Sequence, residues 1–431
     1  MSMFRQDDQL NHRSYYEATA LRDAAKPALQ GRITTDVCVV GGGLAGLSAA
    51  LELAQRGYSV ALLEARRIGW GASGRNGGQI IAGYACDNDV FEQALGAEGA
   101  QTAWQMSIEA IQLIRQRIDT YQIDCDFTPG HLTVSTRPKK TDALRAGFEL
   151  LSQRYHYPHL TFIEPGQIRD WIDSPRYHAA IFDSQSGHLH PLKYTLGLAA
   201  AAEGHGVQLF EHSPVTHLQG GEPATISTSQ GAVQARFVVL AGNVYLGKLA
   251  PSIESRIMPV GTYIIATEPL TPAQADTLIK DRVAVCDNNF VLDYFRTTRD
   301  HRMLFGGRVS YSTLTPANLP EVMRGNMLQT FPQLHDTPVA YCWGGFVDIS
   351  MNRAPDFGRL TPNIYYLQGF SGHGLAVAGL AGRLATEAIA GQAERFDLMA
   401  RIRHRPFPGG KLLRTPALVL GMWYYGLRDR L

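Results

Sequence analysis

The chain has 431 residues, of which 45% are hydrophobic and 18% are charged, and its formal net charge at pH 7 is +1. This length predicts two domains rather than one, and the balanced charge gives no indication of a nucleic-acid partner. The cysteines form no CxxC pair, which argues against a disulfide framework or a zinc site and favours a reducing, cytoplasmic location; they are Cys38, Cys86, Cys125, Cys286 and Cys342.

Residues 1–29 are expected to form an N-terminal extension that belongs to neither domain. They contain no apolar stretch of the kind that a signal peptide needs, so none is expected. No apolar run in the chain reaches the length of a membrane-spanning helix, and we expect no such helix either.

The first strong pattern is a strand, a glycine turn, a helix and a second strand at residues 36–64. The strand leads into Gly41-x-Gly43-x-x-Gly46, and the second strand ends at Glu64. This is the fingerprint of a dinucleotide-binding unit, in which the glycines permit a tight turn, a close pyrophosphate and close helix packing. The helix N-terminus attracts phosphate groups, and the acid at this distance can bond a ribose. The same acid disfavours NADP, whose 2′-phosphate would meet a like charge.

A second glycine-rich run, residues 69–79, follows directly and narrows the expected cofactor. A domain that binds NAD would continue with its next helix and strand, whereas small residues here allow close approach to a ligand. This run resembles the D-amino-acid oxidase/sarcosine oxidase superfamily of FAD-dependent amine oxidoreductases. The resemblance implies that the run lies along the ribityl chain, the pyrophosphate and the flavin ring.

Further along the chain, apolar spacing predicts helices at 90–122 and 141–155 and a turn at 184–190 before an alanine-rich helix. Strands are expected at 132–135, 207–210, 237–243 and 364–368, and an antiparallel sheet is expected from 256–268, 291–296 and 303–309. A final helix begins after the glycine-rich turn at 369–374 and ends near residue 389. In the superfamily this turn meets the pyrimidine end of the flavin, where a positive helix end stabilises negative charge.

These elements predict an α/β fold (α+β over the whole chain) with two discontinuous domains. A Rossmann-like domain would bind FAD and would comprise residues 30–90, 176–255 and 335–431. A substrate domain built on the antiparallel sheet would comprise residues 91–175 and 256–334.

The resemblance implies FAD contacts from both glycine-rich segments and from several strand ends. They are Gly41, Gly43, Leu44, Ala45 and Gly46; Glu64, Ala65 and Arg66; Ala72, Ser73, Arg75, Asn76, Gly77, Gly78 and Gln79; Val215, Ala241, Gly242 and Gly344; and Gly372, His373, Gly374 and Leu375. His373 has two interpretations: it contacts and tunes the flavin as a possible catalytic residue, or it packs in a tight turn. The 14 histidines show no metal-ligand spacing, so no metal is expected.

Four strings are similar to those of the γ-glutamylputrescine oxidases within this superfamily: 72–79, 187–191, 343–345 together with 352–359, and 408–414. That family oxidises a primary amine to an imine with FAD. Water then releases an aldehyde and ammonia, and oxygen reoxidises the flavin to give hydrogen peroxide. The resemblance implies a role in polyamine breakdown.

Hydride transfer from an amine makes modest demands on side chains, because the cofactor carries the difficult step. An apolar, aromatic site favours the neutral amine, and Tyr263, Phe295 and Trp343 are the candidates to line it. An arginine would bind the substrate carboxylate. Arg308 is the first candidate; Arg296 and Arg353 are the others, and Arg353 could instead pair with Asp356.

Other possibilities stay open at this stage. Non-covalent FAD is expected, although Cys342 lies near the position where some sarcosine oxidases attach the flavin. A second reading is a dehydrogenase of another amine or an N-methyl amino acid that passes electrons to a quinone. Residues 415–427 are apolar with basic flanks, and they either contact a membrane surface or dock on the protein itself. A third reading is a non-catalytic flavoprotein subunit.

Overall fold

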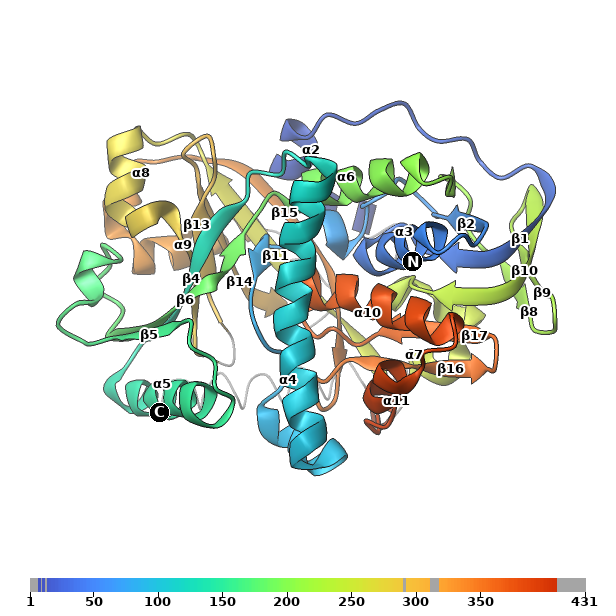
Figure 1. Cartoon of the computed structure of the whole chain (residues 1–431). Helices are drawn as coiled ribbons and strands as arrows, with labels where there is room; N and C mark the ends of the chain where they lie inside the picture. The colour runs from blue at the N-terminus through green and yellow to red at the C-terminus, as the bar shows by residue number, and fades with distance from the viewer. Residues whose placement is uncertain (1–6, 9, 12–13, 290–291, 311–317, 409–431) are drawn as a thin grey trace.

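The computed structural model describes residues 7–8, 10–11, 14–289, 292–310 and 318–408, and these form two β-sheets with helices packed around them (Figure 1). The mixed α/β fold class that the sequence predicts is confirmed. Each sheet corresponds to one half of the molecule in Figure 1, and the long helix α4 (Asn88–Tyr121) stands between the halves.

The first sheet has eight strands, and its central strands are parallel because helices connect them. The order is β16-β17-β10-β1-β2-β7, and β16 is antiparallel to its neighbour. The strands are β1 (Gly31–Val40), β2 (Val60–Leu63), β7 (Gln208–Phe210), β8 (His217–Gln219), β9 (Ala224–Ser227), β10 (Gly231–Leu240), β16 (Asp356–Thr361) and β17 (Ile364–Gln368). The inner parts of β1 and β2 read as continuous apolar runs, as expected for strands buried on both faces.

Helices α3 (Leu44–Gln55), α6 (Pro191–Gly204) and α10 (Gly374–Ile389) cover one face of this sheet (Figure 1). Val37, Val39 and Leu62 point into that helical layer, whereas Cys38 and Leu63 point to the opposite face. On the opposite face, side chains of the central strands share an apolar core with side chains of β8, β9 and the short helix α7 (Pro251–Glu254). The alternation of side chains along β1 therefore divides its residues between two apolar cores.

The second sheet has nine strands in the order β15-β11-β14-β13-β12-β4-β6-β3, with β5 beside β6. All its pairs are antiparallel except β4 and β12. The strands are β3 (Gln79–Ile80), β4 (Thr128–Ser135), β5 (Leu160–Ile163), β6 (Ala179–His188), β11 (Ile257–Thr267), β12 (Ala284–Asp287), β13 (Tyr294–Thr297), β14 (Met303–Ser310) and β15 (Val339–Ser350). The remaining helices include α2 (Tyr15–Thr19), α5 (Pro138–Glu149), α8 (Pro272–Leu278), α9 (Leu319–Thr330) and α11 (Glu394–Ala400).

Two details differ from the expectations drawn from the sequence. The expected turn at 184–190 is the end of β6, and His190 caps α6 by accepting the Lys193 N–H at its Nδ1. The domain limits stay a prediction, but β3, β6 and β15 pair within the second sheet although the prediction assigned them to the FAD domain. Short apolar strands carry no mark of the sheet to which they belong, which is the physical reason for this difference.

The contact between α3 and α10 leaves no room for a side chain at Gly382. A Cβ there would lie 2.5 Å from the Ala45 carbonyl oxygen and 2.5 Å from the Ala49 nitrogen. We expect Gly382→Ala to lower the free energy of unfolding by about 3 kcal/mol, because backbone atoms cannot yield as a flexible side chain can. Urea unfolding measures the change.

Gly147 in α5 is the matched control, since no atom lies within 4 Å of the position of its Cβ. Gly147→Ala should raise stability by up to about 1 kcal/mol, because alanine is the better helix former. Equal effects of the two substitutions would contradict the close contact between the helices.

Candidate functional site

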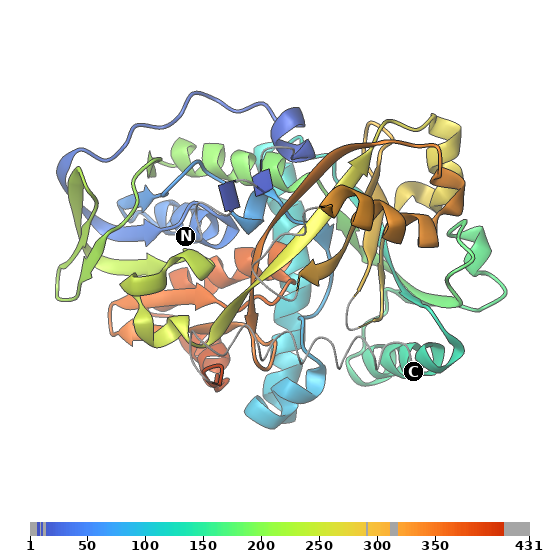
Figure 2. The same ribbon diagram turned by 180° about the vertical axis from the view of Figure 1, so that it is seen from behind.

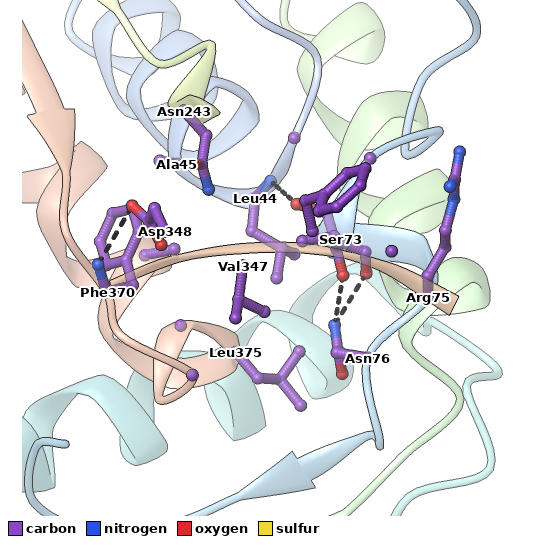
Figure 3. Close-up of a pocket in the computed structure, with 18 of the residues that line it drawn as sticks. Leu44, Ala45, Ser73, Arg75, Asn76, Asn243, Val347, Asp348, Phe370 and Leu375 are labelled. Carbon is purple, nitrogen blue, oxygen red and sulfur yellow. Dashed lines mark hydrogen bonds between the residues drawn. The ribbon is translucent and has the colours of Figure 1, made fainter. Parts of the chain in front are cut away.

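A cavity of about 490 Å³ lies where the two sheets meet, within the usual size range of small-molecule sites. Its walls come from the turn after β1, the loop 69–79, the end of β10, strands β11, β13 and β15, and the turn before α10. Figure 3 shows residues of the turn after β1, the loop 69–79, the end of β10, strand β15 and the turn before α10 arranged around a common space.

The turn after β1 is held by backbone contacts that only glycine permits. Gly41 has φ +115°, and a Cβ there would lie 2.6 Å from the Ala241 carbonyl oxygen at the end of β10. A Cβ on Gly46 would lie 2.0 Å from the Gly41 carbonyl oxygen. The N-terminus of α3 therefore approaches β1 closely and faces the cavity, as the fingerprint predicts.

Glu64 follows β2 and has both carboxylate oxygens engaged by backbone amides. Gly42 N–H donates to Oε2 at 2.7 Å, and Arg66 N–H donates to Oε1 at 2.8 Å. Burial raises the pKa of Glu64, and these backbone hydrogen bonds oppose the rise. Each oxygen keeps a further lone pair, so the carboxylate can still accept a hydroxyl donor from a ligand.

The loop 69–79 lies against the N-terminus of α3 and is fixed by its own polar side chains (Figure 3). Ser73 Oγ accepts the Leu44 N–H at 2.9 Å, so one of the amides at the start of the helix is already engaged. Asn76 donates to the carbonyl oxygens of Ala72 and Ser73 at 3.0 and 3.1 Å and accepts the Gly78 N–H at 2.8 Å. These bonds shape a segment that is rich in glycine and would otherwise be permissive.

Asp348 near the end of β15 fixes the turn that precedes α10, and the sequence analysis missed it. Its Oδ2 accepts the N–H groups of Gly369 and Phe370, the second at 3.2 Å (Figure 3). Burial raises the pKa of Asp348 to about 6, and those backbone bonds oppose the rise. A carboxyl group within an otherwise apolar strand is the signal that could have found it.

His373 stands immediately before α10 and lines the cavity. Burial, with a smaller contribution from the Arg353 charge, lowers the pKa of His373 to about 4, so its ring is neutral at neutral pH. Its buried Nε2 has no hydrogen-bond partner among the described residues. A buried nitrogen of this kind that faces a cavity can bond a ligand.

Three residues that line the cavity have left-handed backbone conformations although none is glycine. They are Asn243 with φ +52°, Arg353 with φ +59° and Ser371 with φ +53°. Such conformations carry an energetic cost and often mark functional sites. Burial lowers the pKa of Arg353, while the neighbouring Cys86 and Asp87 oppose that change.

The family model of the FAD dependent oxidoreductases matches residues 36–388. A curated relative, the gamma-glutamylputrescine oxidoreductase of Escherichia coli (strain K12), is 45% identical over 97% of this chain and 98% of its own length. The probable oxidoreductase OrdL of Haemophilus influenzae is 40% identical over 97% of each chain. This chain belongs to the FAD-dependent oxidoreductase family.

Solved structures agree on the fold. Glycine oxidase from Geobacillus kaustophilus aligns with a TM-score of 0.72 at 18% identity, covering 83% of this chain and 95% of that one. An L-amino acid deaminase from Proteus vulgaris aligns with a TM-score of 0.71 at 17% identity, covering 88% and 99%. At these identities the likeness concerns the fold alone.

FAD is the cofactor of the family, and the cavity has the features that FAD requires. The glycine turn brings backbone amides to one end, where a pyrophosphate can approach the helix. The N-terminus of α10 lies at another wall, with the unpartnered Nε2 of His373 beside it. The donors therefore stand where an anionic, acceptor-rich cofactor would be bound.

Most residues expected to contact FAD line this cavity. They are Gly41, Gly43, Leu44, Ala45, Glu64, Ala65, Ala72, Ser73, Arg75, Asn76, Gly77, Gln79, Val215, Ala241, Gly242, Gly372, His373, Gly374 and Leu375. Gly46, Arg66, Gly78 and Gly344 do not line it. Gly46 lies behind the turn, and Gly344 packs against Tyr263, so both shape the wall without forming its surface.

The expected substrate-site aromatics do not line the cavity, which differs from the expectation drawn from the sequence. Tyr263, Phe295 and Trp343 are fully buried in the protein core. The adjacent residues Thr262 and Tyr294 line the cavity instead, and on β15 the lining begins two positions after Trp343, at Gly345. Successive side chains of a strand point to opposite faces, so on β11 and β13 a shift of one position separates the buried aromatic from the residue that lines the cavity.

The arginine and cysteine candidates also differ in whether they line the cavity. Arg353 lines the cavity, and Asp356 has Arg256 as its ion-pair partner at 3.6 Å. Arg296 does not line the cavity and donates to the Gly77 carbonyl at 2.9 Å. The side chain of Arg308 lies outside the described residues. Cys342 does not line the cavity either, and covalent attachment of FAD is not indicated.

Two features are absent from the described ranges between residues 7 and 408. No group of three or more His, Cys, Asp or Glu residues there could hold a metal ion. No helix in that part of the chain is both long and apolar enough to cross a membrane. The apolar string 415–427 lies outside the described residues.

The raised pKa of Asp348 makes a prediction about stability and pH. Because the folded carboxyl has a pKa of about 6 and its ordinary value is 3.8, the folded chain holds a proton that the unfolded chain has already lost. Stability from this group therefore falls as pH rises through that window. In the chain without added FAD, Asp348→Asn should gain about 3 kcal/mol relative to the wild type between about pH 4 and pH 7.

Urea unfolding at several pH values measures this difference, and the exposed Asp276 supplies the control. Asp276→Asn should run parallel to the wild type across the same pH range. A parallel course for Asp348→Asn would show that the carboxyl titrates normally in the fold.

Proposed function

We propose that this chain catalyses the FAD-dependent oxidative deamination of γ-glutamylputrescine or a related glutamylated amine. The products are an aldehyde, ammonia and hydrogen peroxide, and oxygen is the electron acceptor. The observation that carries the proposal is the 45% identity to the E. coli gamma-glutamylputrescine oxidoreductase over almost the whole of both chains. A role in polyamine breakdown and a cytoplasmic location are part of the same proposal.

FAD, when bound, supplies the acceptor for the hydride that leaves the carbon next to the amine nitrogen. The task of the side chains is then to hold that carbon in place and to favour the uncharged amine. Tyr84, Tyr294 and Leu292 give the cavity an aromatic and apolar wall, which lowers the pKa of an amine by desolvation. The neutral ring of His373 adds no positive charge that would repel the incoming substrate.

Arg353 is the residue that we propose for the substrate carboxylate. It lines the same cavity as His373 and Tyr84, whereas Arg296 lies outside it. Its guanidinium can clamp a carboxylate through two parallel hydrogen bonds. Its left-handed backbone supports a functional reason for its position, because an arginine gains nothing from that conformation by itself.

An anaerobic titration of the FAD-loaded protein with γ-glutamylputrescine tests the proposal. We expect rapid loss of the visible absorption band of oxidised FAD, because the substrate amine delivers its hydride. Admission of air should restore the band and release hydrogen peroxide.

Each contrary outcome has a separate meaning. A band that air does not restore would contradict the oxidase assignment and favour a dehydrogenase with another acceptor. A band that never bleaches would contradict the substrate, and amines without the glutamyl group and N-methyl amino acids would be tested next.

Replacement of Arg353 tests the carboxylate contact. We expect Arg353→Lys to raise KM for γ-glutamylputrescine by about tenfold or more with a smaller change in kcat, because lysine cannot form the paired bonds. Arg359→Lys is the matched control from the same string, since Arg359 pairs with Asp397 and does not line the cavity. A KM that responds equally to both substitutions would remove Arg353 from the site.

A further inference from the structure

The N-terminal segment lies outside the part of the chain that matches the family, yet it reaches the wall of the cavity. The family match begins at residue 36, whereas the described N-terminal residues begin at Asp7. In both whole-chain views this segment runs along the top of the first sheet, and α2 lies where the two sheets meet (Figures 1 and 2). This position brings its side chains next to the loop 69–79.

Asp7 is completely buried and forms an ion pair with Arg75, a residue that lines the cavity. Arg75 Nη1 donates to Asp7 Oδ1 at 2.8 Å and to the Asp7 carbonyl oxygen at 3.2 Å. The hydroxyl of Tyr245 donates to Asp7 Oδ2. Both oxygens of the carboxylate are therefore engaged by residues of the cavity wall.

The rest of the Arg75 guanidinium is buried in the wall of the cavity. Its guanidinium lies over the Trp70 ring with 4.3 Å to the centroid, and Trp70 also lines the cavity. Arg75 Nε and Nη2 are buried and have no hydrogen-bond partner among the described residues. Buried guanidinium donors normally find acceptors, so two open donors in a cavity wall point to an acceptor on the ligand.

A second contact ties the same N-terminal segment to the same loop. The Tyr16 ring packs edge-on against Trp343 with centroids 5.2 Å apart, and Trp343 Nε1 donates to the Arg75 carbonyl oxygen at 3.0 Å. Arg296 Nη2 donates to the Tyr16 hydroxyl at 3.1 Å, while its Nε donates to the Gly77 carbonyl at 2.9 Å. The N-terminal segment thus holds the loop both at Arg75 and at Gly77.

We propose that Asp7 is a positioning residue for FAD, which fixes the Arg75 guanidinium so that Nε and Nη2 donate to the bound cofactor. Asp7 and Tyr16 then act together as a clasp, which we define as the contacts of these two residues that hold the loop 69–79 in place. This inference rests on membership of the FAD-dependent family and not on the proposed amine. Its test uses no substrate, so its failure and the failure of the proposed function are distinguishable.

Asp8 provides a natural comparison, because it also pairs with an arginine. Asp8 Oδ2 lies 2.9 Å from Arg66 Nη2, but 43% and 39% of these two side chains are exposed. Arg66 does not line the cavity. An exposed pair of this kind contributes little, whereas a buried pair holds its geometry strongly.

The experiment measures FAD dissociation from the full-length protein by the fluorescence of released FAD. We expect Asp7→Asn to raise the dissociation constant by about 10- to 100-fold, the factor for one charged hydrogen bond, and Asp8→Asn to change it less than about twofold. Arg75→Gln should also weaken binding. Adding Asp7→Asn to Arg75→Gln should then have no further effect, since Asp7 acts through Arg75.

Two results would overturn the inference: equal effects of Asp7→Asn and Asp8→Asn, or full multiplication of the Asp7 and Arg75 effects in the double variant. A role of Asp7 that does not act through Arg75 predicts that multiplication. If Asp7→Asn does not fold, Tyr245→Phe removes only the hydroxyl that donates to Asp7 and keeps the ring against Trp70. Unchanged FAD release in Tyr245→Phe would then count against the clasp.

Discussion

The site depends on a close approach of backbone to backbone at the turn after β1. The Gly41 carbonyl oxygen lies where a Cβ of Gly46 would stand, and the Ala241 carbonyl lies beside Gly41 itself. These contacts fix the start of α3 relative to the ends of β1 and β10. Because the helix start faces the cavity, its position decides where a pyrophosphate can be bound. Gly382 allows a similar close approach, because the absence of a side chain there lets α10 pack against the backbone of α3.

The second sheet completes the site through one long strand. β15 borders the cavity from Gly345 to Ile349 and carries Asp348, which binds the turn before α10. This part of the cavity is therefore built at the boundary of the two sheets, and the buried carboxyl of Asp348 joins them. Burial of the Asp348 carboxyl opposes its ionisation. The contact is strong because two backbone N–H groups of the turn donate to the same buried oxygen.

Most residues expected to contact FAD line the cavity, whereas the aromatics expected in the substrate site do not. A glycine turn leaves a local signature, because close backbone approach excludes every other residue at Gly41 and Gly46. The substrate wall has no such signature. Thr262 and Tyr263 are neighbours on β11, and the sequence does not reveal which of them faces the cavity when both faces of the strand are covered. The sequence therefore predicted the strands β11 and β13 but chose on each the residue next to the one that lines the cavity, and it did not predict β15 as a strand.

Asp7 was beyond the reach of sequence reasoning for a different reason. Its partner Arg75 is 68 positions away along the chain, and nothing local to a polar N-terminus indicates that one carboxylate becomes completely buried. A buried ion pair adds little net stability compared with apolar side chains of similar size, so stability alone does not account for it. A fixed guanidinium with two open donors does account for it, because FAD offers acceptors on its ring and its phosphates. The charge of Arg75 is then balanced by Asp7 before the cofactor binds, and its direction is set in advance.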